Sequence, residues 1–126
     1  MTLVVIKAFE NRLERMVEGT FARAFKSGLR PVEIGRRLTR EMDADRSVDV
    51  NGRTIVPNQF TVWLSATDIE RFASMTDRLV SELCEAAREH ARDEGYRFVG
   101  PVRVTFELAE RLHTGTFSID AELAEG

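Results

Sequence analysis

A chain of 126 residues that is 43% hydrophobic and 31% charged has the size and balance of one folded domain, which excludes a disordered protein. Its single cysteine, Cys84, excludes an internal disulfide and a cysteine-based zinc site, and it fits a reducing cytoplasm. The net charge of −3 is uneven, because residues 1–46 hold ten Lys/Arg against seven Asp/Glu and residues 47–126 hold eight against fourteen. The apolar run over residues 3–6 is too short for a signal-peptide core or a membrane span, so we expect no membrane insertion.

Two helices are predicted for the first third of the chain. Apolar residues recur every three or four positions over residues 6–25, which indicates one amphipathic helix. Ser27–Gly28 ends this helix, since glycine readily adopts the left-handed conformation that follows a helix. Pro31 begins a second helix that runs to about Ala44, because proline suits the first helical turn.

Strands follow the two helices. Residues 47–50 and 53–56 alternate in polarity on either side of Asn51–Gly52, which is a strong signal for a hairpin turn. Pro57–Asn58 interrupts the pattern, since proline cannot donate to a ladder of strand hydrogen bonds. Residues 60–64 resume it as a strand rich in β-branched and aromatic side chains.

One long helix and two more strands complete the chain. Thr67, with Glu70 three residues later, has the spacing of a capping box and predicts a helix that ends at Gly95. Residues 102–107 and 116–123 then alternate between apolar and polar side chains, as half-buried strands do.

The order α-α-β-β-β-α-β-β predicts an α+β fold with a mostly antiparallel or mixed sheet and helices packed on one face. We expect residues 1–126 to form a single domain. Its core is expected to join Trp63, Leu79 and Phe106 to the apolar faces of the first two helices. The core residues expected from these helices are Phe9, Leu13, Val17, Phe21, Ile34 and Leu38.

No pattern in the sequence predicts catalysis. His90 and His113 lie apart without further ligands at metal-binding spacing, and His90 is expected on a solvated helix face. The sequence has neither a Gly-x-Ser-x-Gly nucleophile elbow nor a glycine-rich phosphate loop. Cys84 lies on the apolar side of the long helix and is expected to be a buried, inert thiol. We therefore expect no enzyme activity, no cofactor and no metal.

Three arginines of the second helix are the candidate partner surface: Arg36, Arg37 and Arg40. Arginine suits interfaces because its planar group binds carboxylates and phosphates in a bidentate manner. The alternative is a solvated helix face on which these arginines pair with Glu33 and Glu41. A nucleic-acid-binding module that uses this helix is the second alternative. The acidic residues of the same helix and a pI near 5.5 make nucleic acid an unlikely partner.

An ordered set of motifs resembles the amino-terminal domain of actinobacterial FhaA-type proteins, which are adapters with a forkhead-associated domain. The opening motif is Phe9-Glu10-x-x-Leu13-Glu14-x-x-Val17-x-Gly19-x-Phe21-Ala22-Arg23-x-Phe25. The further motifs, which extend over almost the whole chain, are Pro31-x-Glu33-Ile34, Leu38-x-Arg40-Glu41, Pro57-Asn58-x-Phe60, Gly100, Val102-x-Val104-x-Phe106 and Leu112-His113-Thr114-Gly115-x-Phe117.

The resemblance implies a non-catalytic adapter domain in Ser/Thr-kinase signalling that regulates peptidoglycan synthesis and growth. It implies a longer protein in which a linker and a forkhead-associated domain follow, and the phosphothreonine-reading function belongs to that second domain. The implied partners are a Ser/Thr kinase and cell-wall synthesis proteins, in a cytoplasmic protein recruited to the inner face of the membrane.

Thr114 is the candidate phosphoacceptor of such a kinase-linked adapter. It precedes Gly115, which can supply a positive φ in a tight turn, so we expect the Thr114 hydroxyl to face solvent. Thr116 is the competing acceptor, which strand pairing is expected to shield. The alternative for Thr114 is a purely local role as a turn residue.

Overall fold

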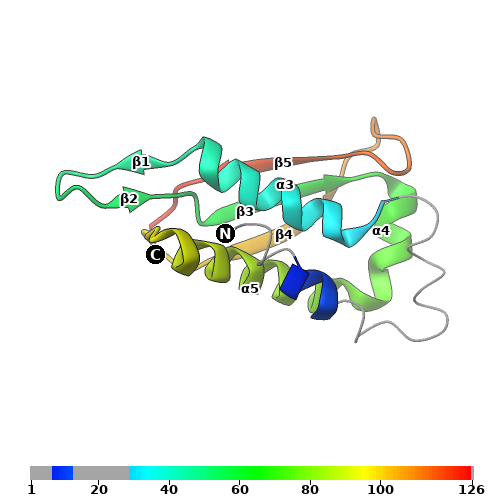
Figure 1. Cartoon of the computed structure of the whole chain (residues 1–126). Helices are drawn as coiled ribbons and strands as arrows, with labels where there is room; N and C mark the ends of the chain where they lie inside the picture. The colour runs from blue at the N-terminus through cyan, green and yellow to red at the C-terminus, as the bar shows by residue number, and fades with distance from the viewer. Residues whose placement is uncertain (1–6, 13–28, 126) are drawn as a thin grey trace.

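A computed structural model of the chain describes residues 7–12 and 29–125 (Figure 1). Residues 7–12 are helical, in agreement with the start of the helix predicted over residues 6–25. The rest of that predicted helix, and with it the expected core residues Leu13, Val17 and Phe21, lies outside the described residues.

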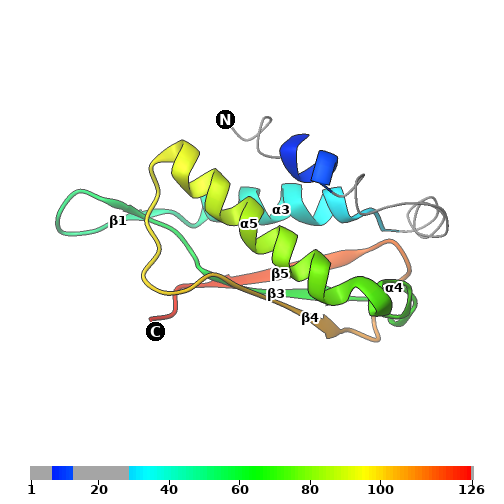
Figure 2. The same cartoon turned by 90° about the horizontal axis from the view of Figure 1, so that it is seen from below.

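The fold is α+β, as predicted, and its main sheet has three strands in the order β4-β3-β5. The central strand β3 (Gln59–Leu64) pairs in parallel with β4 (Arg103–Leu108) and antiparallel with β5 (Phe117–Glu122). Helices α3 (Pro31–Ala44) and α5 (Thr76–Glu94) cover one face, and the segment 7–12 lies over them (Figure 2). No described helix covers the other face, which is called the open face below.

Side-chain alternation along β3 determines which residues reach the core. Phe60, Val62 and Leu64 are buried against the helices, so Thr61 and Trp63 point to the open face. The prediction that Trp63 belongs to the helix-covered core is therefore wrong. Ile34, Leu38 and Leu79 are fully buried and Phe106 packs against the same core, as predicted.

Helix α3 begins with Pro31 at its first turn, as predicted, and the Arg30 N–H donates to Glu33 Oε2 at 3.2 Å. The segment 7–12 packs closely on this helix through Phe9, which is 0% exposed. A Cβ built on Gly35 would lie only 2.8 Å from Phe9 Cε2, so the absence of a side chain at Gly35 permits this contact. Arg12 joins the same segment to α5 through ion pairs with Glu82 and, at 2.9 Å, Glu89.

The long helix predicted from Thr67 to Gly95 is divided into three. It comprises α4 (Ala66–Phe72), the 3₁₀ turn η1 (Ala73–Met75) and α5, which ends as predicted at Gly95 with φ 75°. Thr67 is not the cap. Ser65 has the extended backbone of an N-cap, and its Oγ accepts the N–H of Asp68 at 3.1 Å.

The predicted hairpin forms a separate two-stranded sheet of β1 (Ser47–Val48) and β2 (Thr54–Ile55). Gly52 has φ 78° and its N–H donates to Asp49 O at 3.0 Å, which closes the predicted turn. The hairpin projects from the body of the molecule on the left of Figure 1, and Val50 in its turn is fully exposed.

Candidate functional site

The outward face of α3 carries the three predicted arginines. Arg36, Arg37 and Arg40 are all exposed, while the opposite face of the helix buries Ile34 and Leu38. The helical repeat therefore brings the three arginines to the solvent side of one element.

The three arginines differ in their contacts. Arg37 Nε lies 3.1 Å from Glu41 Oε1, and its guanidinium lies 5.9 Å from the Phe117 ring centroid on β5. Among the described residues, Arg36 and Arg40 have no ion pair. The alternative of a fully paired helix face thus applies to Arg37 alone, and Arg36 and Arg40 remain available to an anionic group.

Thr114 lies in a tight turn between β4 and β5. The Thr116 N–H donates to His113 O at 3.0 Å, and Gly115 has φ 89°, which confirms the predicted turn and its positive φ. Thr114 is exposed, as predicted. Thr116 is also exposed; its hydroxyl donates to His113 O at 2.6 Å, so it is restrained by this bond and not by strand pairing as expected.

A buried carboxylate fixes this turn to the body of the molecule. Asp68, at the start of α4, is 0% exposed, and its Oδ2 accepts the Gly115 N–H at 2.8 Å and the Ser65 hydroxyl at 3.0 Å. Arg71 lies 3.7 Å from Asp68 Oδ1 and partly balances the buried charge. The backbone next to Thr114 is thereby held in place while the Thr114 side chain faces solvent.

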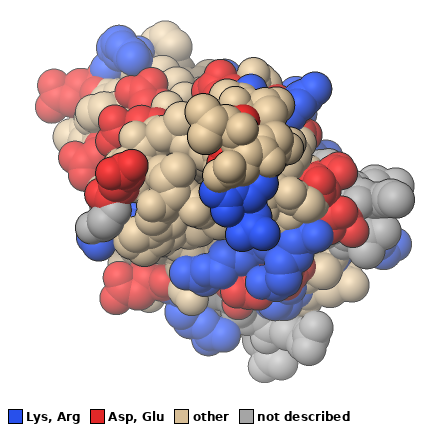
Figure 3. All heavy atoms as spheres, turned by 90° about the vertical axis from the view of Figure 1, so that its left-hand side faces the viewer, with Lys and Arg blue, Asp and Glu red and all other residues tan. Residues whose placement is uncertain are grey.

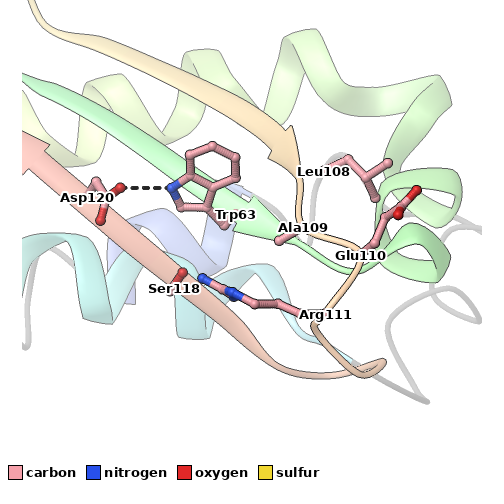
Figure 4. A pocket seen from close by; sticks show the side chains of 7 residues that line it. All are labelled: Trp63, Leu108, Ala109, Glu110, Arg111, Ser118 and Asp120. Atoms are coloured by element: carbon pink, nitrogen blue, oxygen red, sulfur yellow. Dashed lines mark hydrogen bonds between the residues drawn. The ribbon is translucent and has the colours of Figure 1, made fainter.

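A shallow hollow of about 480 Å³ lies on the open face of the sheet, where β3 and β4 end (Figure 4). Trp63 lies at its centre, and its Nε1–H donates to Asp120 Oδ2 at 3.0 Å. Leu108 and Ala109 supply apolar contacts, and Arg111 extends beside Ser118. Sequence reasoning missed this site because it placed Trp63 in the core.

His90 is buried at 0% exposure, so its predicted position on a solvated face is wrong. Its Nε2 lies 2.7 Å from Asp43 Oδ1, which also accepts the Tyr96 hydroxyl at 2.6 Å. Because a carboxylate only accepts, His90 Nε2 carries the hydrogen of this bond. Burial and the adjacent Asp43 raise the pKa of Tyr96 to about 12. The group links α3 to α5 through a histidine that is itself fully buried.

The described part of the chain contains no cluster of three or more His, Cys, Asp or Glu that could hold a metal ion. Cys84 is 8% exposed, as predicted, and burial raises the pKa of its thiol, which disfavours the reactive thiolate. Within residues 7–12 and 29–125, no helix is long and apolar enough to span a bilayer.

Comparison with known proteins identifies the family. Residues 6–120 match the family model described as "FhaA, N-terminal domain". The chain belongs to the FhaA N-terminal domain family. It is 29% identical over 114 residues to the FHA domain-containing protein FhaA of Mycobacterium tuberculosis, a match that covers 90% of this chain and 21% of that protein. The chain thus spans about a fifth of this FhaA relative.

The fold of this FhaA N-terminal domain also matches a solved structure, Rv0020c_Nter. The TM-score is 0.72 at 25% sequence identity, with 86% of this chain and 82% of the other covered. The resemblance inferred from the sequence motifs is therefore confirmed at the level of family and fold.

Proposed function

We propose that this chain is a non-catalytic protein-interaction domain of an adapter protein. The observation that carries the proposal is the match of residues 6–120 to the amino-terminal domain of an FHA-domain protein family. The burial of His90 and Cys84 supports a role without catalysis, since neither side chain can reach a substrate.

In this proposal residues 1–126 are the amino-terminal domain of a longer protein in which a linker and a forkhead-associated domain follow. The protein is an adapter in Ser/Thr-kinase signalling that regulates peptidoglycan synthesis and growth. Its partners are a Ser/Thr kinase and cell-wall synthesis proteins, and it is a cytoplasmic protein recruited to the inner face of the membrane. Phosphothreonine is read by the forkhead-associated domain and not by these residues.

Arg36, Arg37 and Arg40 form the proposed partner surface on α3. The test is affinity capture from an actinobacterial extract, quantified by mass spectrometry, with the three arginines changed to glutamate. The matched control changes Arg78, Arg88 and Arg92 to glutamate, because these exposed arginines of α5 give the same change in net charge. We expect specific partners to be lost from the α3 variant and retained by the control.

Unchanged capture by a folded α3 variant would refute this partner surface. Binding of generic duplex DNA or RNA that weakens steeply with salt and is lost in the α3 variant would instead favour the nucleic-acid alternative. The α3 variant and the α5 control variant serve for both the capture experiment and the nucleic-acid binding experiment.

Thr114 is the proposed phosphoacceptor, supported by its exposure in a turn whose backbone is held by Asp68. A phosphate would add about −1.5 to −2 charges to this exposed side chain. The test is incubation with a Ser/Thr kinase followed by peptide mass mapping of the chain and of its Thr114→Ala and Thr116→Ala variants. Phosphate that is absent from residues 112–117, or lost only in Thr116→Ala, contradicts the assignment.

A further inference from the structure

Trp63 is a large aromatic side chain on the sheet face that none of the described helices covers. Its half-buried ring borders the hollow of Figure 4, between Asp120 on β5 and the start of the loop at Ala109. The hydrogen bond to Asp120 fixes the orientation of the ring and leaves the carboxylate with further capacity to accept. A tryptophan held in this way on a surface is typical of the anchor residues of protein interfaces.

Three carboxylates lie on this open face. Glu107 lies directly opposite Trp63 on β4, and Asp120 and Glu122 lie on the same face of β5. Among the described residues none of these three carboxylates forms an ion pair. Figure 3 shows acidic side chains along its left-hand side, with some basic side chains among them.

The helical side of the molecule is different. Glu41, Glu82, Glu85 and Glu89 are all paired with arginines, and Asp43 binds His90 and Tyr96. On the sheet face, Arg103 of β4 and Arg111 are also present, but among the described residues neither forms an ion pair with Glu107, Asp120 or Glu122.

We propose that the open face of the sheet binds an extended, arginine-bearing segment of a protein partner, anchored by Trp63 and Asp120. A guanidinium can stack on the Trp63 ring and bond to the Asp120 carboxylate at the same time. Asp120 and Glu122 lie two residues apart on one strand, about 7 Å, which equals the spacing of alternate side chains in an extended peptide. The segment thus carries arginine at alternate positions.

Arg111 is the one cation among the residues that line the hollow, and it shapes the specificity. It lies beside Ser118 on the far side of Trp63 from Glu107. A partner residue at that end must be neutral or acidic, so a uniformly basic segment fits less well than one whose charge is confined to alternate positions.

This inference rests on the proposed role as an interaction domain and names a second surface and its ligand. The chain contains a single tryptophan, so intrinsic fluorescence reports on Trp63 alone. The probe is a synthetic Arg-Ser-Arg-Ser-Arg peptide titrated into the full chain at low salt, with the Lys-Ser-Lys-Ser-Lys peptide as comparison. The variant is Glu107→Gln with Asp120→Asn, which keeps an acceptor for the Trp63 N–H.

The matched control is Glu70→Gln with Glu94→Gln, exposed carboxylates of α4 and α5 that give the same change in charge. We expect the arginine peptide to shift the Trp63 emission and to bind the sheet variant about tenfold or more weakly, with little change in the control. The lysine peptide is expected to bind more weakly than the arginine peptide because an ammonium does not stack as a guanidinium does.

Three results would overturn the inference: no emission shift with the arginine peptide, equal weakening in the control variant, or equal affinity for the two peptides. Sedimentation gives a fourth, since self-association abolished by the sheet variant would show that a second copy occupies the face. The α3 arginine variant separates this inference from the proposed function. If the α3 variant loses its protein partners but the arginine peptide does not bind the unmodified chain, only the proposal for the sheet surface is overturned.

Discussion

The close contact between Gly35 and Phe9 predicts that Gly35→Ala destabilises the protein when Phe9 is present and stabilises it when Phe9 is replaced by alanine. Gly35 lies in the middle of α3, and an added Cβ would be 2.8 Å from Phe9 Cε2 and 3.0 Å from Phe9 Cδ2. Carbon atoms in good contact are about 3.5–4.0 Å apart, so the fully buried ring would have to move. Gly35→Ala therefore adds a methyl group to a site that has no room for it.

Two effects of opposite sign set the magnitude. Alanine is favoured over glycine inside a helix by about 1 kcal/mol. Overpacking of a well-packed core costs about 1–3 kcal/mol. We expect Gly35→Ala to lower the free energy of unfolding by about 1 kcal/mol, because Phe9 is closed in on all sides and cannot rotate away.

The same substitution should stabilise the protein once the ring is removed. Phe9→Ala alone is expected to cost about 3–5 kcal/mol. Adding Gly35→Ala to this variant should recover about 1 kcal/mol, since only the helix preference remains. Urea unfolding of all four proteins, followed by circular dichroism, measures the coupling. Effects that add to within about 0.5 kcal/mol would refute the close contact.

Three further predictions concern Asn58, Tyr96 and Cys84. Asn58 is 0% exposed, donates to Pro101 O at 3.0 Å and Ala124 O at 2.8 Å and accepts the Ala124 N–H at 2.9 Å, so Asn58→Ala should cost about 1–3 kcal/mol in urea unfolding. The pKa of Tyr96 is raised from its ordinary value of 10.0 to about 12, so this residue keeps its proton to a higher pH in the folded state than in the unfolded state. The stability that Tyr96 contributes is therefore fully present below pH 10 and is lost as the pH rises from 10 to about 12. Tyr96→Phe should remove this part of the pH dependence of the free energy of unfolding. Burial raises the pKa of Cys84, so iodoacetamide should alkylate it far more slowly in the native protein than in urea, and equal rates would contradict its burial.

Local patterns in the sequence predicted most of the elements correctly. Strand alternation placed β3, β4 and β5 to within a residue or two, and Gly52 and Gly95 marked the hairpin turn and the end of α5. These signals succeed because they depend on backbone geometry within a few residues. The division of the helix at residues 73–75 was not predictable in this way, since the segment contains neither proline nor glycine.

Predictions that depended on which face a residue occupies were less successful. Trp63 was assigned to the core by its size, yet its neighbours Val62 and Leu64 are buried, and alternation places Trp63 on the other side. The parallel pairing of β3 with β4 follows from the helical crossover between them, a connection that the order of elements already contained. This pairing agrees with the predicted mixed sheet, and only the wrong placement of Trp63 concealed the hollow.

The burial of His90 could not be inferred from its own neighbourhood. Glu89 and Arg92 are charged, and the acceptor of His90 is Asp43, which is 47 positions away on α3. Buried polar side chains almost always have a hydrogen-bond partner, and the packing of one element against another brings such partners together. The hydrogen bond between Asp43 on α3 and His90 on α5 therefore depends on tertiary structure and could not be predicted from the local sequence.

The fold turns a modest charge imbalance along the chain into a contrast between two faces. Residues 47–126 carry six more acidic than basic residues, a number that does not say where the excess lies. The packing of the helices brings Arg12 onto Glu82 and Glu89 and so neutralises acidic residues of α5. None of the elements that the structure describes crosses the outer face of β4-β3-β5, so its carboxylates face water. Glu107, Asp120 and Glu122 thus lie on the same face as the half-buried tryptophan, where a basic partner would remove both charge and apolar surface from water.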